Sequence, residues 1–426
     1  MKILRHTDTE YPNFVATLDR RAIPDVTLEK KVAAILATVR TDGDAGLLRL
    51  TKKFDGQTLT PESMRIDPAE IRLAKVDAST EAALQASHRN VHRFARRSMR
   101  RNWSGKNHEG SEVGERFDPL QRVGIYVPAG TAPLASSVLM TATLAQAVGV
   151  PDIVVTTPVG LTGEVHPAVL RALALSGVNE AYKIGGAQAI AALAYGTETI
   201  QPVHKVYGPG NAWVVEAKRQ LFGLVGVDLL PGPSEVLIIA DQTANPAWIA
   251  ADLLAQAEHG HGSVAGFLTP NQGLLRKVEA EVEKQAAQSQ RQDHLTPILR
   301  DHVFLLQTPD LEAAVAIANQ FAPEHLTIVA ENDEALSAKA TTAGAIFLGG
   351  WSPVVAGDFL AGPSHELPTG GAGKAFPGLT ADQFQRRTSL VRMSEASLRK
   401  SVDHIEAFSR VEGLDAHGRS ARIRLE

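Results

Sequence analysis

The first quarter of the chain carries apolar residues at the spacing of an α-helix. Between residues 27 and 54 they recur at intervals of three and four and so share one face, as do Val32, Ile35, Leu36 and Val39. A second helical pattern runs from about residue 68 to 99 and ends in a basic cluster at 93–101. We interpret that cluster as a solvated helix end, the usual setting for such a charge run.

From residue 123 the pattern changes to short β-branched runs that alternate with stretches rich in Ala and Leu. The runs predict strands at 123–127, 152–157, 181–184, 205–208, 227–230, 236–240, 263–269, 302–306, 325–330 and 345–349. The stretches between them predict helices at 134–148, 166–177, 187–196, 211–222, 245–259, 272–288, 311–321 and 333–342. Strands that alternate with helices indicate parallel sheets with crossover helices, an α/β fold.

The strands are too numerous for one sheet, so we expect two doubly wound, incomplete Rossmann-like domains. The segment PGPSE (231–235) is a plausible hinge between them. Ligands of such sheets bind outside the carboxyl ends of the strands. The expected organisation is a helical N-terminal part that completes the first domain (1–122), an NAD-binding-like α/β domain (123–235), an α/β domain with metal and catalytic residues (236–380) and a helical C-terminal tail (381–426).

Composition excludes several classes of protein. The 426 residues have a formal net charge of −4 and no strong basic patch, which argues against a nucleic-acid binder. There is no cysteine, so disulfides, thiolate-bound metals and thiol nucleophiles are excluded. The uncharged run 123–151 is broken early by Pro128, Gly130 and Pro133, and the N-terminus lacks an apolar signal region. We therefore expect a soluble cytoplasmic protein.

Three glycine-rich turns follow predicted strands between residues 120 and 215. They are YVPAGTAPL (126–134), GGAQAI (185–190) and GPGN (208–211). The dinucleotide fingerprint G-x-G-x-x-G is absent, because Trp213 occupies the place of the third glycine after GPGN. A turn that opens a helix can still bring its backbone close to a phosphate or ribose. Each turn alone could be purely structural, but together they favour a nucleotide-binding half.

Four separate segments each offer a histidine together with a carboxylate or an amide. Gln256 and His259 share a face at the end of a predicted helix, where a capping histidine beside a surface glutamine is the simpler interpretation. Glu324 and His325 are adjacent between a helix and a strand, as two proton-transfer groups or as a solvated turn. The other two segments are a long loop (357–371) with Asp358 and His365, and the tail, where Glu412 and His417 could lie in a disordered end. Together the four could assemble a zinc site of nitrogen and oxygen ligands.

The motifs GPGN, PGPSE, QAEH (256–259), APEHL (322–326), GPSHELPTGG (362–371) and EGLDAH (412–417) resemble those of the histidinol dehydrogenase family, in the same order over nearly the whole chain. The resemblance implies a zinc-dependent, NAD-linked, four-electron oxidation of L-histidinol to L-histidine through the aldehyde. It implies one zinc ion per subunit, with Gln256, His259, Asp358 and His417 as ligands. The implied catalytic pair is Glu324 and His325.

The resemblance also implies the remaining contacts. Besides the metal ligands and His325, the implied substrate contacts are Ser234, His365 and Glu412. The implied NAD contacts are Tyr126, Gln188 and Asn211. The family is a homodimer whose helical tail reaches the partner's active site, so Glu412 and His417 would act there. Two positions depart from the family's pattern, Ser364 before His365 (commonly Asn) and Glu366 after it (commonly Val).

The residues are consistent with this chemistry. Without cysteine, the aldehyde cannot be oxidised through a thiohemiacetal, so water must be the nucleophile. His325 is then the candidate base for the hydroxyl protons and Glu324 the activator of water. The rival hypothesis is a paralogue acting on another amino alcohol or a sulfonated diol, which Glu412, His365 and His417 disfavour. A non-catalytic metal- or nucleotide-binding protein would have no structural need for both Glu324 and His325.

Overall fold

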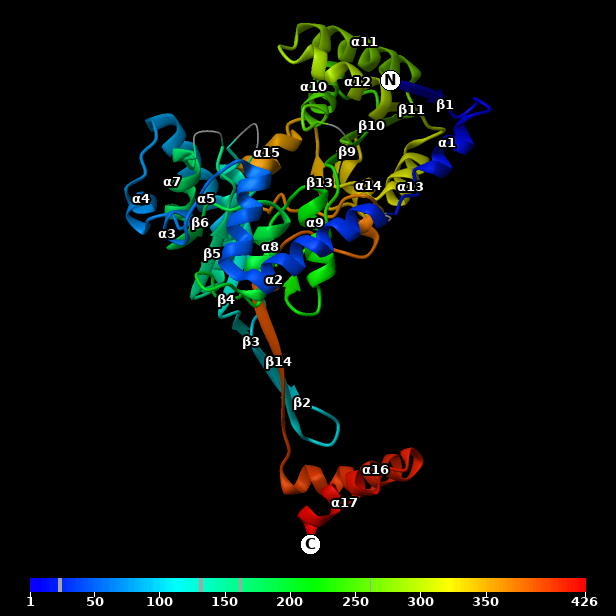
Figure 1. Cartoon of the computed structure of the whole chain (residues 1–426). Helices are drawn as coiled ribbons and strands as arrows, with labels where there is room; N and C mark the ends of the chain where they lie inside the picture. Colours follow the sequence, from blue (N-terminus) through cyan, green and yellow to red (C-terminus); the bar gives the residue numbers. More distant parts are fainter. Residues whose placement is uncertain (22–24, 130–132, 161–162, 261) are drawn as a thin grey trace.

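The computed structural model describes residues 1–21, 25–129, 133–160, 163–260 and 262–426 (Figure 1). It contains two parallel sheets with helices on both faces, one small antiparallel sheet and a helical tail. The predicted fold class, two doubly wound α/β units with a helical N-terminal segment and a helical tail, is confirmed. Among the described helices none is long and apolar enough to cross a membrane. The cytoplasmic location remains a prediction.

The first parallel sheet has the strand order β6-β5-β4-β7-β8. Its strands are β4 (Arg122–Tyr126), β5 (Asp152–Thr156), β6 (Glu180–Tyr182), β7 (Lys205–Tyr207) and β8 (Gly226–Val227). The strands β5 and β6 lie on one side of β4, and β7 and β8 lie on its other side. The strand order therefore reverses between β4 and β7, where Ile125 pairs with Tyr207, and this is the switch point of the sheet.

Helices cover both faces of the first sheet. One face carries α2 (Val26–Asp55), α8 (Gly186–Tyr195) and α9 (Ala212–Leu221), which pack against one another. The other carries α4 (Pro68–Leu73), α5 (Ala78–Ser98), α6 (Ala135–Val148) and α7 (Pro167–Leu175). The short α3 (Pro61–Met64) lies between α2 and α4 in the chain. Asp25 caps α2 by accepting hydrogen bonds from Thr27 N and Leu28 N, and the helix ends at Gly56 with φ of 70°.

The second parallel sheet has the order β1-β11-β10-β9-β12-β13, with its switch point between β9 and β12. Its strands are β1 (Lys2–Arg5), β9 (Glu235–Ala240), β10 (Val264–Thr269), β11 (Val303–Gln307), β12 (His325–Val329) and β13 (Ala345–Leu348). One face is covered by α10 (Pro246–Ala257), α11 (Gln272–Gln288) and α12 (Gln292–His302). The other is covered by α1 (Tyr11–Thr17), α13 (Leu311–Phe321) and α14 (Asp333–Ser337). The segment after β13 contains α15 (Val354–Phe359), η1 (Ala372–Lys374) and η2 (Ala381–Phe384).

The tail extends away from both parallel sheets. The antiparallel sheet β14-β3-β2 is built from β2 (Trp103–Lys106), β3 (Glu112–Pro119) and β14 (Gln385–Arg392). In Figure 1, β14 leads from the body to the helices α16 (Glu395–Glu412) and α17 (Asp415–Arg422), followed by η3 (Ile423–Leu425), at the far end of the molecule. These helices share only a small core of Leu398, Val402 and Ala421, while Phe408 and Val411 are 69% and 85% exposed.

The N-terminal part, expected to be helical, also contains three strands. β1 joins the edge of the second sheet through β11, and β2 and β3 pair with each other. The expected helical tail likewise contains a strand, β14, between the 3₁₀-helix η2 and the helix α16. β1 has only four residues, too few for a clear alternation, and β14 is a polar strand exposed over most of its length, so its sequence lacks an apolar face. The helix α12 was also not predicted.

Candidate active site

The candidate site residues lie in two places, at the carboxyl ends of strands of the first sheet and at the amino ends of two strands of the second. Tyr126 ends β4 and the GPGN turn follows β7, at the switch point where ligands of parallel sheets bind. In the second sheet the functional residues lie at the opposite end, because Glu235 and His325 are the first residues of β9 and β12. The carboxyl-end rule therefore does not locate the Glu324–His325 pair.

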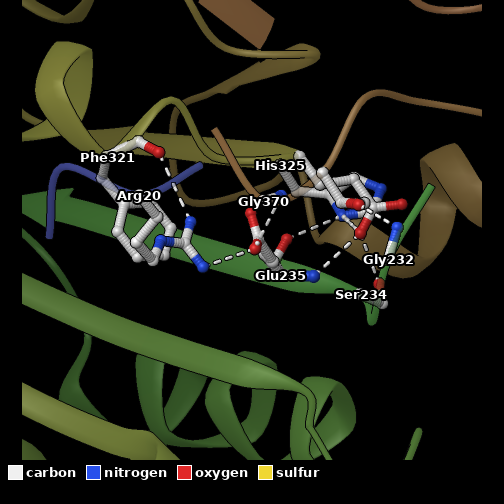
Figure 2. Close-up of polar contacts among 9 residues, drawn as sticks. Arg20, Gly232, Ser234, Glu235, Phe321, His325 and Gly370 are labelled. Atoms are coloured by element: carbon white, nitrogen blue, oxygen red, sulfur yellow. Dashed lines mark hydrogen bonds and ion pairs between the residues drawn. The ribbon is translucent and has the colours of Figure 1, made fainter. Parts of the chain in front are cut away.

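Glu324 and His325 are both buried and are held by the start of β9. Glu324 Oε2 accepts hydrogen bonds from Ser234 Oγ at 2.5 Å and from Glu235 N at 2.8 Å. His325 Nδ1 lies 3.1 Å from the carbonyl oxygen of Glu235, and Figure 2 shows the imidazole next to this strand. The pair is thus an ordered constellation, and the solvated-turn alternative does not fit its burial.

The partner of His325 Nδ1 defines the tautomer of the ring. A carbonyl oxygen can only accept a hydrogen bond, so Nδ1 carries the proton and Nε2 is left with its lone pair. Nε2 lies 3.7 Å from Asp358 Oδ1, on the side of the ring opposite to β9. Burial lowers the pKa of His325, although the charge of Asp358 opposes the shift. His325 is therefore a neutral base at neutral pH, with Nε2 as its accepting atom.

Burial has the opposite consequence for Glu324. It raises the pKa of this carboxyl group to about 8, against the hydrogen bonds from Ser234 and Glu235, which lower it. A carboxyl group with a pKa near the working pH can both take and return a proton. Glu324 Oε2 and His325 Nδ1 lie 3.6 Å apart, so the site holds two groups capable of proton transfer whose pKa values burial moves in opposite directions.

Asp358 and His365 of the long loop are brought to this pair. Asp358 belongs to α15, and His365 Nδ1 lies 3.0 Å from its carbonyl oxygen. Burial would lower the pKa of His365, but Glu366, 3.4 Å from Nε2, raises it overall. His325 and His365 line a cavity of about 450 Å³ whose other walls include Phe347, Leu348 and Trp351.

The two residues that depart from the family's pattern are buried beside His365. Ser364 Oγ donates to the carbonyl oxygen of Met140 at 2.8 Å and accepts from Glu366 N at 3.2 Å. Ser364 therefore joins α6 of the first unit to the loop, and Glu366 supplies His365 with a carboxylate partner. Glu366 thus contacts His365 directly, whereas Ser364 acts on the neighbouring main chain, and the histidine itself stays in the site.

Three of the four predicted metal ligands belong to this region. Gln256 is buried in the last turn of α10, which contacts α15, the helix that carries Asp358. His259 follows α10 and is near enough for its charge to affect the pKa of His325. Gln256 Nε2 is buried without a hydrogen-bond partner, and the two ends of an amide are interchangeable by a flip of the side chain. Among the described residues, no three His, Cys, Asp or Glu side chains converge as a metal site.

The fourth predicted ligand, His417, and the predicted substrate contact Glu412 are not brought to the site within one chain. Glu412 is the last residue of α16, and His417 lies on α17. Figure 1 shows both helices beyond the end of β14, far from β9 and β12. These two side chains can meet the other ligands only in a second copy of the chain or after a large movement of the tail.

The three predicted NAD contacts lie around the switch point of the first sheet. Tyr126 Oη accepts from Gly186 N at 3.2 Å, and burial raises its pKa to about 12. Gln188 Nε2 donates to Asp55 at 3.4 Å. Asn211 caps α9 by accepting from Trp213 N and Val214 N. The turn at 126–134 is described only in part, since residues 130–132 lie outside the described chain.

The GPGN turn is fixed by a buried ion pair that the sequence did not reveal. Gly208 has φ of 103°, and a Cβ there would lie 2.0 Å from the carbonyl oxygen of Tyr126, so only glycine fits. Asp228 Oδ2 accepts from Gly208 N at 2.7 Å, and Lys218 Nζ donates to Gly208 O at 2.8 Å. Lys218 and Asp228 also form an ion pair with each other, and both side chains are almost completely buried.

Sequence reasoning also missed Arg20 and Glu235 beside Glu324 and His325. Arg20 Nη1 forms a 2.6 Å ion pair with Glu235 Oε1, and its guanidinium carbon lies 3.6 Å from the centre of the Phe321 ring (Figure 2). Glu235 falls within the PGPSE motif, which could have marked it. No signal in the sequence connects Arg20 to a partner 215 positions away.

The sequence and the fold of this chain are similar to those of known proteins. The family model described as histidinol dehydrogenase matches residues 18–425. Histidinol dehydrogenase of Heliobacterium mobile is 41% identical over 420 residues, and that of Cereibacter sphaeroides is 44% identical over 427 residues, with 98% of each chain covered in both cases. The crystal structure of histidinol dehydrogenase from Elizabethkingia anophelis superposes with a TM-score of 0.94 at 34% identity, covering 100% of this chain and 98% of that one.

Proposed function

The chain belongs to the histidinol dehydrogenase family, and from that premise we propose that it oxidises L-histidinol to L-histidine through L-histidinal, with zinc and NAD⁺ as cofactors, in the last two steps of histidine biosynthesis. The observation that carries the proposal is the buried pair Glu324–His325, in which an imidazole with a free Nε2 lies beside a carboxyl group with a pKa of about 8. Such a pair suits a reaction that removes protons from two different oxygens.

In the alcohol oxidation, His325 acts as the base. Its Nε2 takes the hydroxyl proton of L-histidinol as the carbon loses a hydride, and Asp358 at 3.7 Å stabilises the imidazolium that results. Bound NAD⁺ supplies the hydride acceptor for both oxidations. The bond from Nδ1 to Glu235 O keeps the ring in the orientation and tautomer that this step requires.

In the aldehyde oxidation, Glu324 activates water. Its carboxylate takes a proton from a water molecule as the oxygen attacks L-histidinal, which gives the monoanion of the hydrated aldehyde. His325 then takes a hydroxyl proton from this diol as the second hydride leaves, which yields the carboxylate. The balance is one alcohol, one water and two NAD⁺ consumed, with one carboxylate, two NADH and three protons released.

The residues present fit a zinc ion. Gln256 Nε2 is buried without a partner, and a flip of this amide would put its oxygen there as a ligand. His259 and Asp358 add nitrogen and oxygen donors of the type that zinc accepts. His417 would complete the set from another subunit. Zinc held by these residues would orient the amine and imidazole of the substrate next to His325.

The residues at the first switch point fit a dinucleotide. Tyr126 and Asn211 flank the turn at Gly208, whose close approach to Tyr126 leaves no space for a side chain, and Gln188 follows the Gly186 N–H that donates to Tyr126 Oη. This region is the nucleotide-binding end of a doubly wound sheet. The three residues would hold NAD⁺, which would supply the hydride acceptor.

We further propose a homodimer in which each tail reaches the partner's site. The tail carries exposed apolar side chains, including Phe408 and Val411, and its helices have little core of their own. Exposed apolar surface of this extent is typical of an interface. A swapped tail would bring Glu412 and His417 to the otherwise incomplete site of the other subunit.

The roles within the catalytic pair are tested by two substitutions assayed on each half-reaction separately. Glu324→Gln should slow oxidation of L-histidinal far more than oxidation of L-histidinol, because only the aldehyde needs hydration. His325→Asn should slow both by roughly 10²–10⁴-fold, the usual contribution of a general base. Glu334→Gln, at an exposed position on α14, is the matched control and should change neither rate. Small and equal effects of both substitutions would contradict the assignment.

A further inference from the structure

Both proposed catalytic residues are held by the main chain of one residue, Glu235. Its N–H donates to Glu324 Oε2 at 2.8 Å, which favours the carboxylate. Its carbonyl oxygen accepts from His325 Nδ1 at 3.1 Å, which keeps Nε2 unprotonated. Any rotation of this peptide at the start of β9 would therefore disturb the water-activating group and the base together.

The side chain of Glu235 is fixed on the opposite side from the pair. Oε1 accepts from Arg20 Nη1 at 2.6 Å and from Gly370 N at 3.0 Å. Arg20 in turn donates from Nη2 to the carbonyl oxygen of Phe321 at 3.3 Å and lies over the ring of the same residue. Figure 2 shows the resulting row, with Arg20 at one end, Glu235 in the middle and His325 at the other.

The charge of Glu235 also acts on Glu324. The groups that face Glu324 are Glu235 on β9, His325 on β12 and, at longer range, Asp358 on α15. The negative charges of Glu235 and Asp358 both oppose ionisation of Glu324. Arg20 is the cation paired with Glu235, and it is only partly exposed, so solvent screens this pair weakly.

We propose that Arg20 and Glu235 are positioning residues for this reaction: Glu235 aligns Glu324 and His325 through its peptide groups, and Arg20 neutralises the Glu235 side chain so that Glu324 can ionise and activate water. This inference rests on the proposed function only for the identity of the water-dependent step. The ionisation of Glu324 and the tautomer of His325 are properties of the protein itself.

The test is a double-mutant cycle read on the pH profile of L-histidinal oxidation. Arg20→Met leaves Glu235 without its cation. The uncompensated negative charge should raise the pKa of Glu324, so the acid limb of the profile should move up by about one pH unit. Glu235→Gln removes the negative charge and keeps the size of the side chain, so the limb should move down. The double variant Arg20→Met/Glu235→Gln should return the limb toward its wild-type position. Arg20→Lys, which keeps the charge, and Arg21→Met, at the exposed neighbouring position, should leave the limb in place.

A second readout does not depend on the substrate. The measurement is carboxyl ¹³C NMR of protein labelled at glutamate Cδ, with Glu324→Gln used to identify the resonance of Glu324. The pKa of Glu324 should rise in Arg20→Met, fall in Glu235→Gln and return toward the wild-type value in the double variant. A uniform loss of activity without a shift in either the profile or the resonance would mean a merely structural role and overturn the inference. If the resonance shifts as expected while wild-type protein does not oxidise L-histidinol, the positioning stands and the proposed function fails.

Discussion

Replacing Lys218 by methionine should both destabilise the first unit and weaken its binding of NAD⁺. Lys218 and Asp228 are a fully buried ion pair whose two members also hold the main chain of Gly208, through Lys218 Nζ and Asp228 Oδ2. Methionine has nearly the volume of the lysine stem, so packing is kept while the charge is lost. Asp228 would then be a buried carboxylate without its cation, a change that costs about 3–5 kcal/mol.

The assay is urea unfolding followed by far-UV circular dichroism, together with KM for each substrate. The variant should unfold at a lower urea concentration than wild type, and KM for NAD⁺ should rise while KM for L-histidinol is unchanged, since Gly208 begins the turn that carries Asn211. Lys218→Met/Asp228→Asn, which removes both charges, should recover much of the stability. Lys277→Met, at an exposed position on α11, should change stability by no more than about 0.5 kcal/mol. Equal unfolding midpoints for Lys218→Met and this control would refute the reasoning.

Three other predictions concern pH, the tail and the metal. Burial raises the pKa of Asp252 from 3.8 to about 6. Because the pKa of this group is higher in the folded than in the unfolded protein, stability is lost as the pH rises between about 4 and 6. Asp252→Asn should thus stabilise the protein at pH 7 by about 1–3 kcal/mol and give no gain near pH 4, and equal midpoints at pH 7 would contradict this. Mixing inactive His417→Ala and His325→Ala subunits under exchange should restore about a quarter of wild-type activity if the tail acts in the partner's site, and none if it acts in its own. Chelation should abolish activity and zinc restore it, with weaker zinc binding in His259→Asn; full activity of metal-free protein would contradict the ligand assignment.

The sequence predicted the parallel sheets well because their strands are buried on both faces. Runs such as 236–240 are continuously apolar and β-branched, a pattern that does not depend on the partner strand. β1 and β14 have no such pattern: the first is a short edge strand whose partner lies some 300 positions further on, and the second is polar and exposed. Their pairing is decided by tertiary contacts, which local periodicity does not report.

The same distinction applies to the site. Glu324 and His325 could be proposed from one motif because the two groups are adjacent in the chain, and resemblance to a known family supplied the more distant residues. Arg20 could not be predicted, since its importance comes from contacts with Glu235 and Phe321 that only the fold creates. Nothing in the sequence marks Lys218 and Asp228 as a pair, and only the fold shows that they are buried together and hold the turn at Gly208.

The central claim is that one site performs both oxidations, and the number of NADH molecules formed per molecule of L-histidinol tests it most directly. The measurement uses limiting L-histidinol, excess NAD⁺ and the zinc-loaded enzyme, with NADH followed by absorbance and the organic product identified by chromatography. The account predicts about two NADH per L-histidinol and L-histidine as the product, because His325 serves both hydride transfers and Glu324 supplies the hydrated aldehyde between them. A reproducible single equivalent of NADH with release of L-histidinal would contradict it.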